Sequence, residues 1–277
     1  MKKQGALPWF GGKNPANPVN KWINSVIGFD PKKSYIEPFA GMLGVLLSRQ
    51  KVITELVNDY NSNLVNWWLC VRDNPEELAC LMEKTPFSRE VFAHAIKNIN
   101  SKKYKKDKIK RAMFFHVMIS QSVKSCETKN VSDWIAGYSN NRGVTTYKLP
   151  FFAALSSRLE RVRIENTDAI KILKKSIDVK DCVIYCDPPY LTADTSPYGD
   201  FPFNKDEFVD VFKNHKADIA ISGYSDEWDF LGFEKSTFET KFIGRNRDTK
   251  TTKRTEHLWT NFKPRNAIES EGMFSGY

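Results

Sequence analysis

Short apolar segments with strand character alternate with helical patterns at both ends of this 277-residue chain. The first five are Ser34 to Phe39, Val52 to Asp59, Arg163 to Asn166, Cys182 to Cys186 and Asp218 to Ser222. Such alternation predicts a mostly parallel sheet with helices on both faces, because each crossover helix packs back onto the sheet. Two later segments, Phe233 to Thr240 and His257 to Phe262, are predicted to pair as a hairpin. We therefore expect an α/β fold of the nucleotide-binding type that ends in an antiparallel hairpin.

The stretch from about Asp73 to Pro150 interrupts this alternation and has little strand character. Its length of about 75 residues is that of a small domain. We predict a sheet domain formed by residues 1–72 and 151–277, with a mainly helical domain inserted at residues 73–150. Recognition of a partner is expected to lie in this insertion.

The composition excludes several classes of protein. With 41% hydrophobic and 13% aromatic residues, the chain can bury a sizeable core and is not expected to be disordered. Its apolar runs are short and broken by charge, so we predict neither a membrane span nor a signal peptide. The five cysteines include no C-x-x-C pair and the four histidines are scattered, which argues against disulfides and a metal site. We expect a globular protein of the reducing cytoplasm.

Positive charge is concentrated in one part of the insertion. The chain holds 42 Lys and Arg against 33 Asp and Glu, a formal net charge of +9. Between Lys97 and Arg111 it reads KNINSKKYKKDKIKR, with Asp107 as the one acidic residue. Taken by itself, this run fits a solvated helix start as well as a surface that contacts phosphates.

A glycine-containing loop follows the first predicted strand. Glu37 to Gly44 reads EPFAGMLG, and ligands bind at such loops in open α/β sheets because glycine lets the backbone approach them. Asp59 ends the second predicted strand, where an acidic side chain accepts hydrogen bonds from ribose hydroxyls. The alternative for Asp59 is a turn or helix cap within Asn58 to Asn61.

The second chemical motif ends the fourth predicted strand. Val183 to Cys186 runs into Asp187-Pro188-Pro189-Tyr190, where two prolines stop strand pairing and leave carbonyl groups unpaired. The Asp187 carboxylate and the Pro188 carbonyl are then two adjacent acceptors for the hydrogens of a planar amino group. Tyr190 is placed to stack on the base that carries this group. The amino nitrogen would attack an electrophile held in the neighbouring nucleoside site.

These motifs together resemble the Dam-like family of adenine-specific DNA methyltransferases. The matching segments are, in order, Trp9 to Lys13, Tyr35 to Gly44, Asn58 to Asn61, Leu159 to Asp168, Asp187 to Tyr190 and Arg254 to Asn261. The resemblance implies a Rossmann-like S-adenosylmethionine-dependent methyltransferase fold with an inserted target-recognition domain. It also implies methyl transfer from S-adenosylmethionine to the exocyclic amino group of a flipped adenine in DNA.

The resemblance assigns roles to particular residues. The implied catalytic residues are Asp187, Pro188, Pro189 and Tyr190. The implied cofactor-binding residues are Trp9, Lys13, Phe39, Ala40, Gly41, Asp59, Asp168 and Asp187. Within the insertion, the expected DNA-binding residues are Lys102, Lys103, Lys105, Lys106, Asn140, Asn141 and Arg142. We expect DNA, in duplex form, as the partner, no metal, no membrane, and a monomer or weak dimer.

Two departures concern the recognised sequence. Family members that methylate GATC commonly carry Lys where this chain has Pro8, and their recognition hairpin is not reproduced after Gly143. These departures argue against GATC and leave relaxed specificity open. Two other functions also stay open, namely methylation of an amino group on RNA, cytosine or protein, and nucleic-acid binding with a degenerate active site. The basic insertion disfavours a protein substrate, and the intact motifs at Gly41, Asp59 and Asp187 disfavour an inactive protein.

Overall fold

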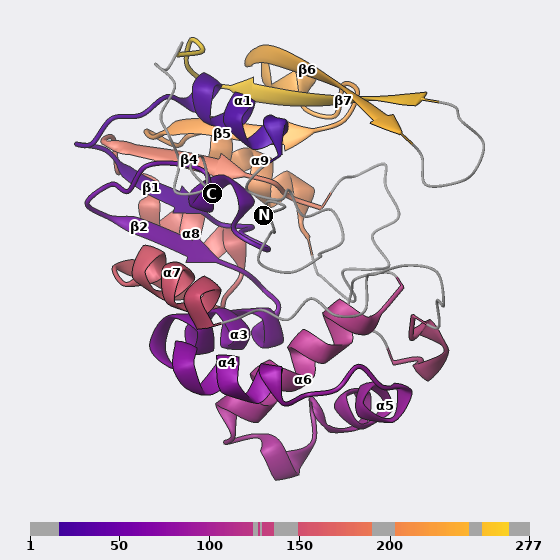
Figure 1. Ribbon diagram of the computed structural model, residues 1–277. Coiled ribbons are helices and arrows are strands. Elements are labelled where there is room, and N and C mark those ends of the chain that lie inside the picture. The colour runs from indigo at the N-terminus through magenta and orange to yellow at the C-terminus, as the bar shows by residue number, and fades with distance from the viewer. Residues whose placement is uncertain are drawn as a thin grey trace.

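The computed structural model describes residues 17–123, 127, 129–135, 149–189, 203–243 and 251–265. Within these residues, seven strands form one sheet in the order β3-β2-β1-β4-β5-β7-β6 (Figure 1). The strands are β1 (Ser34–Glu37), β2 (Glu55–Asn58), β3 (Val162–Glu165), β4 (Cys182–Cys186), β5 (Asp218–Gly223), β6 (Glu234–Ile243) and β7 (Thr251–Thr260). Strands β1 to β5 pair in parallel, and β7 pairs antiparallel with β5 and β6. The parallel sheet and its C-terminal hairpin are therefore confirmed.

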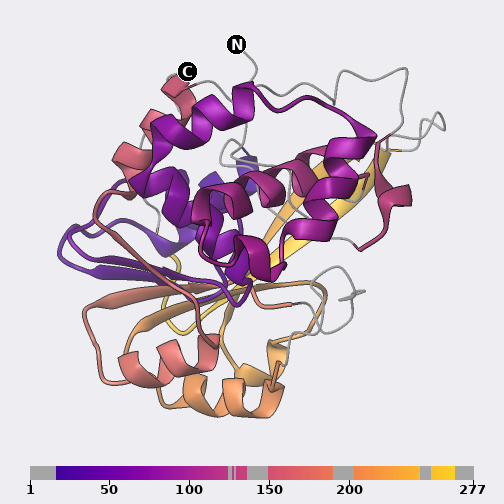
Figure 2. The ribbon, with the colours of Figure 1, turned by 90° about the horizontal axis from the view of Figure 1, so that it is seen from below.

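Helices cover both faces of the sheet (Figure 2). The α-helices of the described residues are α1 (Pro18–Ile27), α2 (Gly44–Leu47), α3 (Ser62–Asp73), α4 (Pro75–Glu83), α5 (Arg89–Asn98), α6 (Lys108–Gln121), α7 (Leu149–Leu159), α8 (Ala169–Ser176) and α9 (Lys205–Lys213). Three short 3-10 helices are η1 (Lys102–Tyr104), η2 (Val131–Asp133) and η4 (Asp229–Leu231). Helices α8 and α9 lie on one face, whereas α1 and α3 to α7 lie on the other. The strand order reverses between β1 and β4, which is where open α/β sheets bind ligands.

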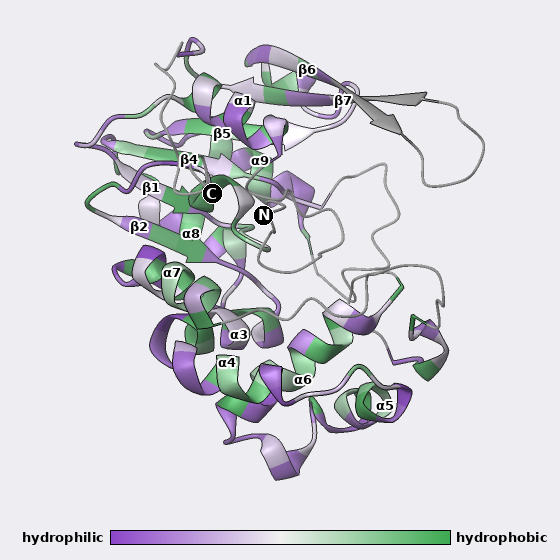
Figure 3. Ribbon diagram, viewed as in Figure 1, coloured by the Kyte–Doolittle hydropathy of each residue, from purple (hydrophilic) through white to green (hydrophobic). Residues whose placement is uncertain are grey.

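The hydrophobic core lies in two layers, one on each side of the sheet. Side chains of β4 alternate between them, so that Val183 and Tyr185 join one layer while Ile184 and Cys186 join the other. All five residues of β4 are buried, which explains why this strand is apolar throughout instead of alternating. Figure 3 shows the same pattern, with hydrophobic residues along the central strands and hydrophilic ones on the outer turns.

The helices of residues 73–150 share a core with the sheet. Phe115 of α6 belongs to the same buried cluster as Trp67 of α3 and Tyr35 of β1. The rings of Trp67 and Trp68 lie 4.7 Å apart, edge to face, beneath α6 and α7. The described part of this region is mainly helical, as predicted, and α3 is the element on which it packs. The division into two domains stays a prediction.

The starts of β2 and β7 differ by three or more residues from the prediction. Strand β2 begins at Glu55 instead of Val52, because the chain bends there and the Val52 amide donates to the Glu55 carboxylate (3.4 Å). Strand β7 begins at Thr251, well before His257, and its first residue pairs with Ile243. Threonine favours extended backbone because it is branched at Cβ, so the threonine-rich segment continues the hairpin beyond the parallel sheet.

Ion pairs join distant parts of the chain. Arg158 of α7 makes a bidentate pair with Glu55 of β2, at 2.6 and 2.9 Å, and both side chains are buried. At the first residue of β5, Lys33 and Arg265 both donate to Asp218. Within the described residues, no helix is long and apolar enough to cross a membrane, and no three metal-ligating side chains cluster. Four of the five cysteines are described, and all four are free thiols.

Candidate active site

The segments that follow β1, β2 and β4 meet at the carboxyl edge of the sheet. Ile36 of β1 pairs with Ile184 of β4 and with Leu56 of β2, so the three strands end side by side. The Ala40 amide donates to the Asn58 carbonyl (2.9 Å), which holds the first loop against the end of β2. The part of this edge at β1 and β4 is the candidate site, because the strand order reverses between these two strands.

Both carboxylate oxygens of Asp59 accept hydrogen bonds from the backbone. Oδ2 accepts from the Gly41 amide (2.9 Å) and Oδ1 from the Asn61 amide (2.8 Å). Burial raises the pKa of Asp59, the two amides lower it, and the negative charge of Glu127 raises it. A backbone hydrogen bond from Tyr60 also lowers the pKa of Asp59. Three backbone donors leave the carboxylate with acceptor capacity for a ligand hydroxyl, because its two oxygens offer about four lone pairs. The sequence also allowed Asp59 to form a turn or a helix cap. Asp59 does form an Asx turn with Asn61, but the residue that caps α3 is Asn61.

The loop after β1 holds two residues in the left-handed conformation. Gly41 has a φ of 48° and Leu43 a φ of 58°. Leucine seldom adopts this conformation because its Cβ crowds the backbone, so Leu43 is a strained position at the candidate site. The Trp68 indole donates to the Gly41 carbonyl (3.0 Å), and fully buried Leu43 is the N-cap residue directly before α2. Packing against α3 therefore holds the loop in its strained shape.

Asn58 ties the ends of three strands together, a role that the motifs did not reveal. Its Nδ2 donates to the Pro38 carbonyl (2.9 Å) and the Thr167 carbonyl (3.0 Å), while its Oδ1 accepts from the Thr167 amide (2.9 Å). Asn166 adds a bond to the Asp59 carbonyl (2.8 Å). The sequence does hold a signal for this role, since Asn58 is an asparagine that ends an apolar strand. A buried amide side chain needs partners for its donors and its acceptor, so such a residue is expected to bind neighbouring backbone.

Strand β4 delivers Asp187 and two prolines to the same edge. Asp187 is half-buried and Pro188 is buried, directly after the fully buried Cys186. Burial raises the pKa of the Cys186 thiol, and the charges of Asp187 and Glu37 raise it further, because both carboxyls lie around the end of β4. The structure thus brings Asp187 and Pro188 beside the loop after β1.

Glu37 is a buried carboxyl at the end of β1, only 2% exposed. It accepts a hydrogen bond of 2.5 Å from the Tyr35 hydroxyl, and the Arg49 guanidinium lies 3.9 Å from the centre of the Tyr35 ring. Burial raises the pKa of Glu37 from 4.5 to about 7, because the hydrogen bond from Tyr35 and the charge of Arg49 offset it only in part. Glu37 therefore changes charge near neutral pH.

Three other predicted cofactor residues lie at the ends of β1 and β3. The Phe39 ring packs edge to face against Phe208 of α9, with centroids 5.7 Å apart. Ala40 is buried beneath the loop. Asp168 caps α8, since its Oδ1 accepts from the Ile170 amide (2.9 Å). Its expected place near the adenine of a cofactor stays a prediction.

The basic run surrounds the start of α6. Its four predicted DNA-binding lysines, all exposed, are Lys102, Lys103, Lys105 and Lys106. Arg111 instead turns inward and donates to Asn63 Oδ1 of α3 (2.8 Å). Six further predicted site residues, Trp9, Lys13, Asn140, Asn141, Arg142 and Tyr190, lie outside the described residues.

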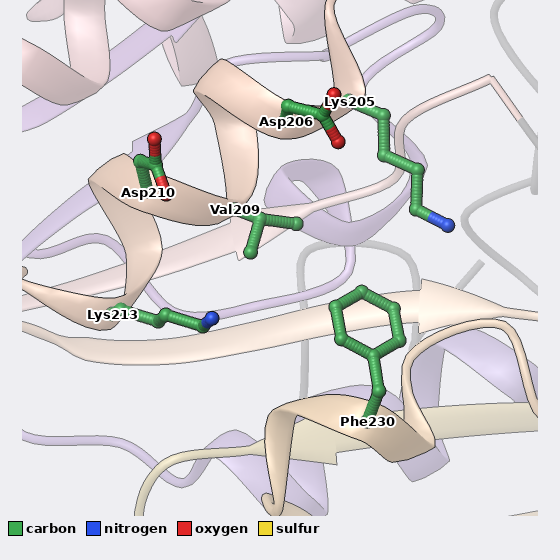
Figure 4. Close-up of a pocket in the computed structure, with 6 residues that line it drawn as sticks. All are labelled: Lys205, Asp206, Val209, Asp210, Lys213 and Phe230. Atoms are coloured by element: carbon green, nitrogen blue, oxygen red, sulfur yellow. The ribbon is translucent and has the colours of Figure 1, made fainter.

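An open hollow of about 470 Å³ lies between α9 and η4 (Figure 4). It is lined by Lys205, Asp206, Val209, Asp210, Lys213 and Phe230. The Lys205 ammonium lies 4.9 Å from the centre of the Phe230 ring, which is 54% exposed. Because no predicted site residue lines this hollow, we do not assign it to the candidate active site.

Comparisons with known proteins identify a family for this chain. The family model of D12 class N6 adenine-specific DNA methyltransferases matches residues 9–263. A comparison with curated proteins finds no match. Among solved structures, precorrin 8W decarboxylase of Methanobacterium thermoautotrophicum is 12% identical (TM-score 0.38, covering 92% of this chain and 99% of that one). SMU.472 with bound SAH, provisionally described as a methyltransferase, is 10% identical (TM-score 0.32, covering 89% and 52%). Similarity this low supports no argument about this chain.

The family match covers the sheet, both carboxyl-edge motifs and the helical insertion. It confirms the resemblance that rests on the segments from Trp9 to Asn261, and it identifies an enzyme. The sheet is the Rossmann-like methyltransferase fold that this resemblance implies. The chain belongs to the D12 class N6 adenine-specific DNA methyltransferase family.

Proposed function

We propose that the protein transfers a methyl group from S-adenosylmethionine to the amino nitrogen of an adenine flipped out of duplex DNA. One observation carries this proposal. The Asp59 carboxylate with its Gly41 contact and the Asp187-Pro188 segment lie at one edge of the sheet, where the strand order reverses. A site for a nucleoside and a site for an amino group are thus neighbours, which a transfer between two bound molecules requires.

The residues at the end of β2 fit S-adenosylmethionine. When bound, this cofactor supplies an electrophilic methyl group on a sulfonium. Asp59 would accept hydrogen bonds from its ribose, because the Gly41 and Asn61 amides hold the carboxylate in place and leave lone pairs available. Tyr60, which is 48% exposed beside Asp59, offers an aromatic face to the adenine of the cofactor. The remaining predicted contacts are those of Phe39, Ala40, Asp168, Trp9 and Lys13.

Asp187 and Pro188 would bind the target amino group. The Asp187 carboxylate and the Pro188 carbonyl each accept one amino hydrogen, which turns the nitrogen lone pair out of conjugation with the ring. The prolines have no N–H to donate, so neither competes for these acceptors. Tyr190 would stack on the base. Catalysis then rests on alignment and electrostatics provided by residues of this chain.

The basic insertion would supply the binding energy for base flipping. Extracting an adenine from the stack costs a few kcal/mol, and phosphate contacts are the usual compensation. Lys102, Lys103, Lys105 and Lys106 are exposed. In the run from Lys97 to Arg111 the one acidic residue is Asp107, which caps α6. We assign the reading of base edges to Asn140, Asn141 and Arg142.

Transfer of tritiated methyl groups to unmethylated duplex DNA tests this function. The DNA is hydrolysed to nucleosides after incubation with the purified protein and labelled S-adenosylmethionine. We expect label in N6-methyldeoxyadenosine for the wild type and none for Asp187→Ala. Parallel incubations with single-stranded DNA and with RNA identify the preferred form of the substrate. Label in cytosine, label only in RNA, or no transfer with any substrate would overturn the proposal.

A further inference from the structure

Glu127 of the insertion binds the chain segment that follows Asp59. Its Oε2 accepts from Asn61 Nδ2 (2.6 Å) and its Oε1 from Asn63 Nδ2 (2.7 Å). Asn61 is the N-cap residue of α3 and Asn63 lies in its first turn, and 66 residues separate Glu127 from Asn61. Both contacts are short and charge-assisted, and such bonds are about twice as strong as neutral ones.

The carboxylate determines how both amide side chains are oriented. Because a carboxylate only accepts hydrogen bonds, each asparagine must turn its amino group toward Glu127 and its oxygen away. The Asn61 oxygen then accepts from the Asn63 and Leu64 amides, which caps α3. The Asn63 oxygen accepts from Arg111 of α6. One negative charge thus sets a network that includes two helices.

This network ends at the candidate cofactor carboxylate. The amide of Asn61 donates to Asp59 Oδ1, so the residue that Glu127 binds through its side chain also binds Asp59 through its backbone. Asp59 Oδ2 is fixed separately by Gly41. The negative charge of Glu127 is one of the causes that raise the pKa of Asp59, which agrees with their proximity.

We infer that Glu127 is a positioning residue for the cofactor site, supplied by the inserted segment, which holds Asp59 in its binding orientation through Asn61. The inference rests on the proposed function, since it takes Asp59 to bind the ribose of S-adenosylmethionine. A glutamine at position 127 has nearly the same shape but one acceptor instead of two. It would satisfy one asparagine and present a donor to the other.

Binding of S-adenosylhomocysteine and steady-state kinetics on duplex DNA test the inference. We expect Glu127→Gln to weaken binding and to raise the KM for S-adenosylmethionine about tenfold, with kcat at saturation unchanged. If Glu127 only stabilised the fold, the substitution would lower the fraction of folded enzyme, and the apparent kcat would fall in proportion. Glu83→Gln is the matched control, because Glu83 is an exposed glutamate of the same insertion at the end of α4. It should behave as the wild type.

A double-mutant cycle shows whether Glu127 acts through Asp59. Asp59→Asn weakens S-adenosylhomocysteine binding by itself. Adding Glu127→Gln should then weaken binding no further, because the group that it positions is already lost. Asn61→Ser is a second variant, which tests the same contact if Glu127→Gln does not fold. Serine still caps a helix but lacks the amino group that reaches Glu127, so the KM should rise as in Glu127→Gln.

The outcomes separate the inference from the proposed function. If the wild type does not bind S-adenosylhomocysteine, or if Asp59→Asn binds it equally well, the proposed cofactor site is wrong. If Asp59→Asn loses binding while Glu127→Gln and Asn61→Ser bind as the wild type, only the inference is overturned. Additive losses in the double variant would also contradict it.

Discussion

The Asp59 carboxylate accepts a hydrogen bond of 2.9 Å from the amide of Gly41, which lies 18 residues earlier in the chain. This bond makes the loop after β1 and the end of β2 one unit at the carboxyl edge of the sheet. Since Gly41 is left-handed and Leu43 is strained, the loop needs such a tether to keep its shape. Asp59 therefore shapes the loop as well as offering oxygens to a ligand.

Substitution Asp59→Asn replaces one acceptor with a donor that faces a backbone amide. We expect the affinity for S-adenosylhomocysteine to fall at least about tenfold, as follows from the loss of one hydrogen bond to a charged group. Calorimetric titration measures this change, and thermal unfolding checks that the variant is folded. An unchanged affinity would show that the ribose does not bind at Asp59.

Substitution Asp187→Asn removes the charge but preserves the size of the side chain at the end of β4. We expect kcat to fall at least about 100-fold, because the target amino group loses an anionic acceptor that stabilises developing positive charge. Single-turnover methyl transfer measures this step. Binding of S-adenosylhomocysteine serves as the control. Asp187 is also an implied cofactor contact, but because Asp59 is intact, this affinity should fall much less than kcat. Full activity of the variant would exclude Asp187 from the reaction.

Replacement of Lys102, Lys103, Lys105 and Lys106 by glutamine tests the basic run. Each lost phosphate contact lowers the slope of log K against log salt by about 0.9, so by about 3.6 if all four bind phosphates. Fluorescence anisotropy with duplex DNA at several salt concentrations gives the slope. The matched control replaces four exposed lysines on the α8 and α9 side, namely Lys171, Lys175, Lys180 and Lys213. Equal slopes for the two variants would show that the four lysines of the basic run do not contact DNA phosphates.

Glu37 predicts a pH dependence of stability. Its folded pKa of about 7 lies above the ordinary 4.5, so burial favours the protonated form. Its contribution is complete below pH 4.5 and is lost as the pH rises through 7, which amounts to roughly 3 kcal/mol. Urea unfolding of the wild type and of Glu37→Gln should show that the variant gains relative stability between pH 5 and 8. A constant difference over this range would contradict the assignment.

The buried pair of Arg158 and Glu55 predicts an asymmetric response to substitution. Arg158→Met leaves the Glu55 charge buried without its partner, and we expect a loss of about 3–5 kcal/mol in the free energy of unfolding. Adding Glu55→Leu removes the stranded charge and should recover most of this loss. Urea unfolding measures both variants. If the double variant is as unstable as Arg158→Met, the loss in the free energy of unfolding comes from packing and not from the unpaired charge.

The sequence predicted those parts of the fold and site that depend on local patterns. Apolar segments identified the parallel strands, and Asp187 and Asp59 each stand at the end of one. Because parallel strands end at the same edge, the two motifs were expected to meet. The parallel sheet followed from the same alternation, and the C-terminal hairpin from the two last strand segments, whereas the order of the strands is known only from the structure.

The features that sequence did not predict depend on contacts between distant segments. Asn58 binds Thr167 across 109 residues, and Glu127 binds Asn61 across 66. An asparagine that ends an apolar strand is a local signal, but no local pattern identifies Thr167 as the partner of Asn58 or Glu127 as the partner of Asn61. The raised pKa of Glu37 likewise follows from its burial, which only the folded chain creates. The early start of β7 at Thr251 depends on pairing with β6.

Methylation of adenine in DNA through the Asp187 loop is the function that we propose for this chain. Its most direct test is nucleoside mass spectrometry of DNA from bacterial cells that lack their own adenine methylation and express the protein. We predict N6-methyldeoxyadenosine with the wild type and none with Asp187→Ala at equal expression. Methylated cytosine in place of adenine, or N6-methyldeoxyadenosine that persists with Asp187→Ala, would contradict the account.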